Sequence, residues 1–260
     1  MIRISPENIF TNLSNNKLRF AIQILSKTMP EMIKTEIESF VLVNQKGIFE
    51  KILSMAISVD DLQDQTRFRH LLTIPYSEII SFVLDYIRRK TSLTVFFWSV
   101  CLIFLGICAA IRIDIAGYFE FRKILTHTLL GSVIFPVLII PVHEGLHIVP
   151  YFLLGARKIR IGMDLSQFIF YVTAHRHVVT PRIFRIVAII PFIMISLTSL
   201  FLVLCLPGLW KWSFSLFLFV HATMCAGDFA MLNFYHINKS RKIYTWDDAD
   251  QKEAYFYEEL

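Results

Sequence analysis

The sequence predicts a mainly α-helical, polytopic membrane protein with about four transmembrane helices. Hydrophobic residues make up 55% of its 260 residues, including 24 Phe, and charged residues make up only 18%. Soluble domains carry about 25% charged residues, so this composition favours a membrane protein. Four apolar runs, each close to the roughly 20 residues that a helix needs to cross a bilayer, supply the spans.

Residues 1–90 differ from the rest because charged residues are spread among the apolar ones, as in a soluble domain. Ser5, Pro6 and Glu7 are typical of a helix start, with Ser as the cap and Pro in the first turn. We expect several short amphipathic helices in this segment, forming a soluble cytoplasmic domain. No motif in it points to a particular chemistry.

The apolar runs define a transmembrane domain over residues 91–238, and residues 239–260 should form a cytoplasmic tail. Only residues 207–211 separate the third run from the fourth, so these two should form a tight antiparallel pair. The four runs extend over residues 93–111, 128–154, 184–206 and 212–234.

Positive charges predict the orientation of the spans. The flanks on one side carry twelve Lys and Arg residues, and those on the other side carry four. Lys and Arg are enriched on the cytoplasmic side of membrane proteins. We therefore expect an integral protein of a bacterial cytoplasmic membrane with both termini in the cytoplasm. The four residues on the opposite side are Arg112, Arg122, Lys123 and Lys211.

The segment between the second and third runs favours strands. Residues 158–162 alternate polar and apolar side chains, and residues 168–173 are aromatic or β-branched. Both patterns are typical of β-structure. We expect a short β-ribbon on the cytoplasmic surface, directly after the second span.

The second run contains His143, Glu144 and His147 in the order H-E-x-x-H. On a helix, residues i and i+4 lie on one face, so both imidazoles can reach one metal ion. Glu144 lies beside them, where it can accept a proton from a water molecule at the metal. Such side chains are costly in hydrocarbon, which favours a function over chance.

A catalytic zinc site needs a third protein ligand. Asp228 is the acidic residue inside the fourth run, and its expected depth agrees with that of His147, because each lies ~10 Å from the end of its span. Gly227 beside it would allow close approach of a neighbouring helix. His221 is the rival: it shares a face with Asp228, and could be a ligand, an outer partner of a ligand or a polar group near a substrate.

These features resemble the site-2 protease class of intramembrane zinc metalloproteases. More closely, residues 126–248 resemble a family of membrane zincins of undetermined function. The positions that carry this resemblance are His143, Glu144, His147, Gly227 and Asp228. Site-2 proteases usually have Asp-Gly where this chain has Gly-Asp, so Asp228 is carried over less directly than the two histidines.

The resemblance implies a Zn²⁺-dependent endopeptidase. The expected metal ligands are His143, His147 and Asp228, with Glu144 as general base. The expected partners are a membrane-embedded or membrane-adjacent protein or peptide substrate and the lipid bilayer, and no nucleic acid. The oligomeric state is not predicted.

Three other functions stay open from the sequence. The first is a non-catalytic membrane protein with a structural or regulatory metal, which a fourth protein ligand such as His221 would favour. The second is a transporter-like bundle that moves ions or protons through His and Asp, which predicts polar residues along several spans. The third is a maturation or immunity factor that applies the same chemistry to one dedicated peptide.

Overall fold

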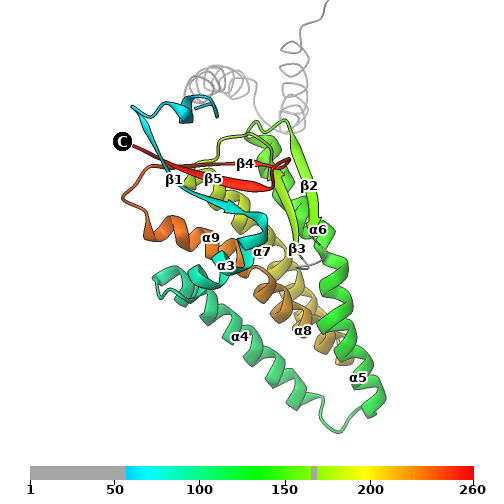
Figure 1. The fold of residues 1–260 in the computed structure, drawn as a ribbon. Helices are drawn as coiled ribbons and strands as arrows, with labels where there is room; N and C mark the ends of the chain where they lie inside the picture. The colour runs from blue at the N-terminus through cyan, green and yellow to red at the C-terminus, as the bar shows by residue number, and fades with distance from the viewer. Residues whose placement is uncertain (1–56, 165–168) are drawn as a thin grey trace, which may run out of the picture. The chain divides into compact units, whose positions relative to one another are not determined.

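The computed structural model describes residues 57–164 and 169–260 (Figure 1). The expected helix start at Ser5 lies outside the described residues, as does the rest of 1–56. The described part is mainly helical, and four helical stretches are long and apolar enough to cross a membrane. The predicted fold class is confirmed to this extent. The four stretches are Ser92–Asp114, Phe121–Leu153, Pro181–Cys205 and Gly208–Ile237.

Two of the spans are single helices with threonine caps. Thr91 and Thr94 form a reciprocal capping box at the start of α4 (Ser92–Asp114). Thr180 caps α7 (Pro181–Cys205), in which the first helical position is a proline. Both helices expose many large apolar side chains, as expected of surfaces that face lipid.

The second span is continuous but irregular. It consists of α5 (Phe121–Leu129), one π-helical turn named η3 (Leu130–Ile134) and α6 (Phe135–Leu153). In η3, Gly131 lies against the backbone of Ser213, where an added Cβ would lie 2.2 Å from the carbonyl oxygen. A glycine is therefore required for the second and fourth spans to approach this closely.

The fourth span is broken, a feature that its apolar pattern does not predict. It consists of α8 (Gly208–Met224) and α9 (Ala226–Ile237), with Cys225 between them in a non-helical conformation. Only Leu206 and Pro207 connect α7 to α8, and the two helices are in extensive contact. The predicted close pair of the third and fourth spans is thus present.

Residues 57–90 are less helical than expected. They contain the short 3₁₀ turns η1 (Asp61–Gln63) and η2 (Tyr76–Glu78), the strand β1 (Phe68–Pro75) and one helix, α3 (Ile79–Arg88). The strand forms because β1 pairs antiparallel with the C-terminal strand β5 (Glu253–Glu259). A local pattern does not reveal a partner so distant in the sequence.

The predicted tail is also structured. Strand β4 (Ile243–Asp248) pairs antiparallel with β5, so the sheet has the order β1-β5-β4. The sheet therefore joins residues from the first and the last of the three expected segments. The other edge of β4 is covered by the segment after the ribbon, through bridges at Asp247 and Thr245.

The predicted β-ribbon is present as an antiparallel pair. Strand β2 (Ile159–Asp164) pairs with β3 (Ile169–Ala174), with Ile159 opposite Ala174. The pair packs against α6, where Tyr151 lies in one hydrophobic cluster with Ala174 of β3 and Val187 of α7. All five strands lie at the same end of the helices (Figure 1).

Candidate metal centre

Helix α6 and the first turn of α9 bring three predicted site residues together. The Nε2 atoms of His143 and His147 lie 3.2 Å apart. One carboxylate oxygen of Asp228 lies 3.6 Å from Nε2 of His143, and the other lies 3.6 Å from Nε2 of His147. The three side chains are mostly buried and form a group that could hold one metal ion.

The spacing of the two Nε2 atoms and the Asp228 carboxylate suits zinc. In a tetrahedral site with bonds of about 2.0–2.2 Å, neighbouring ligand atoms lie roughly 3.3–3.6 Å apart. The two Nε2 atoms lie 3.2 Å apart, and each lies 3.6 Å from a different oxygen of the Asp228 carboxylate. Two imidazoles and one carboxylate are also a ligand set found in catalytic zinc sites, which leave one position open. The two histidines and Asp228 are therefore suited to bind zinc, the ion that the H-E-x-x-H motif predicts.

The second nitrogen of each imidazole also has a partner. Nδ1 of His147 lies 3.0 Å from the carbonyl oxygen of Val187 on α7. Because a carbonyl only accepts hydrogen bonds, this Nδ1 carries the proton and the neutral ring presents a lone pair at Nε2. Histidine ligands in metal sites are commonly oriented in this way.

His221 does not join the group formed by the two motif histidines and Asp228. Its Nε2 lies 3.2 Å from Nδ1 of His143, on the side of that ring away from His147 and Asp228. A second possible group, His143 with His221 and Cys225, would use this opposite side. The Cys225 thiol instead donates a hydrogen bond to the carbonyl oxygen of His221, as a protonated thiol does.

Glu144 lies next to His143 on α6 and is half-buried. Within the described residues, no hydrogen bond or ion pair holds its carboxylate. It interacts electrostatically with His143 and Asp228, which places it within the field of the group. Its carboxylate oxygens are thus free to accept a proton from a molecule bound beside the group.

The break at Cys225 has a direct consequence for the site. It makes Asp228 a residue of the first turn of α9 rather than of a helix interior. The positive end of the α9 dipole then favours its negative charge. Broken helices with polar termini are a recurring way to build ion sites at membrane depth. Gly227 does not serve the expected close approach, since an added Cβ would meet only Val83, at 4.0 Å.

A third possible group lies outside the spans, where no sequence motif points to it. It consists of His175, Asp248 and Asp250. Two of the three side chains already accept hydrogen bonds in this turn: Nδ1 of His175 accepts from the backbone N–H of Ala249, and Asp248 accepts from two backbone N–H groups. These hydrogen bonds stabilise the turn between β4 and β5, which accounts for the cluster without a metal ion.

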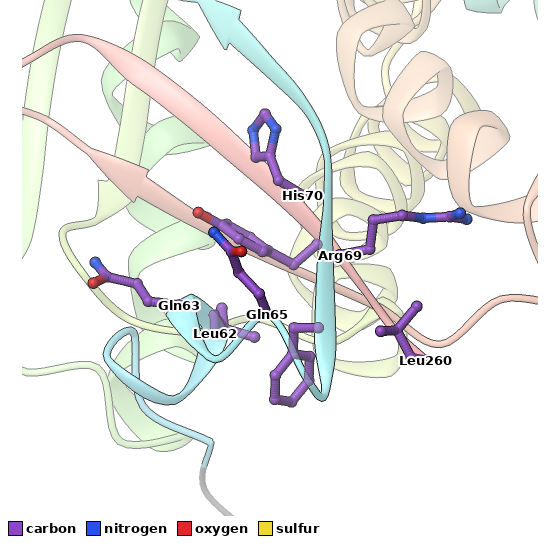
Figure 2. A pocket seen from close by; sticks show the side chains of 8 residues that line it. Leu62, Gln63, Gln65, Arg69, His70 and Leu260 are labelled. Carbon is purple, nitrogen blue, oxygen red and sulfur yellow. The ribbon is translucent and has the colours of Figure 1, made fainter.

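A cavity of about 610 Å³ lies beside β1 and β5, away from the histidines. Figure 2 shows His70 and Arg69 projecting from β1 at its edge, and Leu62 and Gln63 from the preceding turn. None of the predicted site residues lines it, so it plays no part in the chemistry of the metal centre.

The comparisons with known proteins bear on the segment that contains the site. No curated protein and no solved structure matches the chain. A family model does match, and the matched residues include the H-E-x-x-H motif, the ribbon and Asp228. Zincins are peptidases whose H-E-x-x-H motif binds zinc. Residues 136–242 match the family described as "Putative zincin peptidase", which confirms the predicted resemblance to a zincin family.

Proposed function

We propose that the protein is a zinc-dependent intramembrane metalloprotease that hydrolyses a peptide bond in a membrane-embedded or membrane-adjacent substrate. The observation that carries the proposal is the triangle of His143, His147 and Asp228, with ligand-type spacing, on helices apolar enough to cross a membrane. The zincin family match supports the same chemistry.

Zinc held by these three residues would activate a water molecule and polarise the scissile carbonyl. Glu144 would take the proton of that water on a free carboxylate oxygen and later deliver it to the leaving amine. The apolar walls of α4, α6 and α7 would exclude bulk water, which strengthens electrostatic interactions at the site.

The β2–β3 ribbon supports a role in presenting the substrate. It follows α6 directly, and Ile161 and Met163 on β2 are exposed. A helical substrate must unwind locally before its backbone can be attacked, and an unwound segment could add to the ribbon as a further strand.

The alternatives are less well supported. A structural metal site would need a fourth protein ligand, and His221, the rival ligand of the fourth span, faces the other nitrogen of His143. A transporter would place ionisable groups along several spans. In α4 and α7, however, the Asp, Glu, Lys and Arg residues lie only near the helix ends.

The test is metal analysis together with proteolysis by the purified protein in detergent, with a fluorescently labelled single-span transmembrane peptide as the probe. We expect Glu144→Gln to keep one zinc per chain and to cleave about 10²–10⁴-fold more slowly, the usual contribution of a general base. His147→Ala should lose both zinc and cleavage. Glu120→Gln, at an exposed carboxylate before α5, is the matched control and should change neither.

Two results would overturn the proposal. One is full zinc occupancy in His147→Ala, which would refute the ligand assignment. The other is a Glu144→Gln variant that cleaves the transmembrane peptide as fast as the wild type.

A further inference from the structure

His221 is a buried polar residue, and the roles assigned to the zinc ligands and the general base do not account for its presence. It is fully buried on α8, and its Nε2 lies 3.2 Å from Nδ1 of His143. Its own Nδ1 has no hydrogen-bond partner among the described residues. A buried polar atom without a partner is costly, so an imidazole at this position needs a compensating role.

The proton positions define that role. If His143 binds an ion through Nε2, its proton must lie on Nδ1, and Nδ1 becomes a donor. The atom in front of it is Nε2 of His221, which can accept only if the His221 proton lies on Nδ1. The unpartnered nitrogen of His221 is therefore the one that must carry the proton.

We propose that His221 is the positioning residue of the metal centre: its Nε2 accepts the Nδ1 proton of His143 and so directs Nε2 of His143 at the ion. This inference rests on the proposed function. His221 then does for His143 what the Val187 carbonyl does for His147. Each ligand imidazole is fixed in one tautomer by an acceptor from a different helix.

The packing around His221 suits a fixed acceptor. Phe217, one turn earlier on α8, lies with its ring centroid 6.0 Å from that of His221. On the next turn, the Cys225 sulfur lies 3.4 Å from the His221 carbonyl oxygen and 3.9 Å from Nε2 of His221. Because a thiol is a weak donor and Nδ1 of His143 lies closer, at 3.2 Å, His143 is the better partner for Nε2 of His221.

The experiment compares two variants of similar size and polarity in the full-length protein. A Gln side chain can place an oxygen where Nε2 of His221 lies, whereas Asn reaches only the position of Nδ1. We expect His221→Asn to bind zinc about 10–100-fold more weakly in chelator competition, the usual loss for an outer partner of a ligand. His221→Gln should recover most of the affinity. His221→Phe, with a ring but no acceptor, gives the same comparison if His221→Asn does not fold.

A spectroscopic measurement separates positioning from a loss of stability. With Co²⁺ in place of zinc, the visible absorption of the wild type and His221→Gln should agree, and that of His221→Asn should differ.

Wild-type affinity and spectrum in folded His221→Asn or His221→Phe would overturn the inference and leave the proposed function intact. Suppose that the wild type and His221→Gln bind zinc more tightly than His221→Asn, but that no cleavage depends on Glu144. That result would overturn the proposed function and leave His221 as the positioning residue. A wild type that binds no zinc would overturn both.

Discussion

At the scale of single residues, each of the four ring nitrogens of His143 and His147 faces a defined neighbour. His143 and His147 turn their Nε2 atoms toward Asp228, and their Nδ1 atoms toward His221 and Val187. The two Nε2 atoms thus lie close together next to a carboxylate. Imidazole nitrogens and a carboxylate placed together in this way can stabilise a cation.

Asp228 offers a test of this arrangement. Replacing it with Asn keeps the shape but removes the negative charge and the carboxylate donor. We expect Asp228→Asn to weaken zinc binding by more than the roughly 10–100-fold loss typical of outer partners. Chelator competition measures the affinity, and Asp85→Asn, at an exposed ion pair on α3, is the control. Zinc affinity equal to that of the wild type would exclude Asp228 as a ligand.

The residues of the motif could be predicted from the sequence because the α-helix fixes their geometry locally. His143 and His147 must share a face at a spacing of four residues. The place of His221 could not be predicted, because it depends on the rotation of α8 against α6. That rotation is set by tertiary contacts, such as the close approach of Gly131 to Ser213, which no local pattern encodes.

At the scale of elements, the apolar runs predicted the spans but not their irregularities. The break at Cys225 contains no proline, and its apolar neighbours resemble those of a continuous helix. The strands β1, β4 and β5 were not expected because strand formation depends on partners far apart in the sequence. The β2–β3 ribbon could be predicted because both of its strands lie within one short segment.

The sheet carries a carboxylate that should make stability depend on pH. Asp247 lies on β4, on the same face as Thr245 and Ile243, which point into the core. Part of the residue remains accessible, yet burial raises the pKa of its carboxyl from 3.8 to about 7. The tyrosines near it, Tyr76 and Tyr235, are neutral in this range.

Because the folded pKa lies above the unfolded pKa, the fold favours the protonated carboxyl. Stability from this group is complete below about pH 4 and is lost as the pH rises toward 7. Unfolding in detergent, followed at pH 5 and pH 8, should show a smaller decrease in stability for Asp247→Asn than for the wild type. Equal decreases would show that the Asp247 carboxyl does not titrate in this way.

At the scale of the whole molecule, the five strands and the basic flanks belong to the same set of connections. The ribbon follows the second span, the β4–β5 hairpin follows the fourth, and β1 precedes the first. We predict that all of these segments share one side of the membrane, because an even number of spans would return the chain to its starting side. The excess of Lys and Arg in the same connections favours the cytoplasm for that side.

Cysteine labelling tests this orientation, because Cys101, Cys108 and Cys225 are buried and only Cys205 is exposed among the four native thiols. In a Cys205→Ser background we would place one cysteine at Tyr118, which is 79% exposed between α4 and α5. A second variant would carry it at Lys242, before β4, where the side chain is 74% exposed. An impermeant maleimide added to intact cells should label Tyr118→Cys at once, but Lys242→Cys only after the membrane is opened. The opposite order of labelling would invert the orientation, and labelling of both variants in intact cells would contradict a chain that crosses the membrane four times.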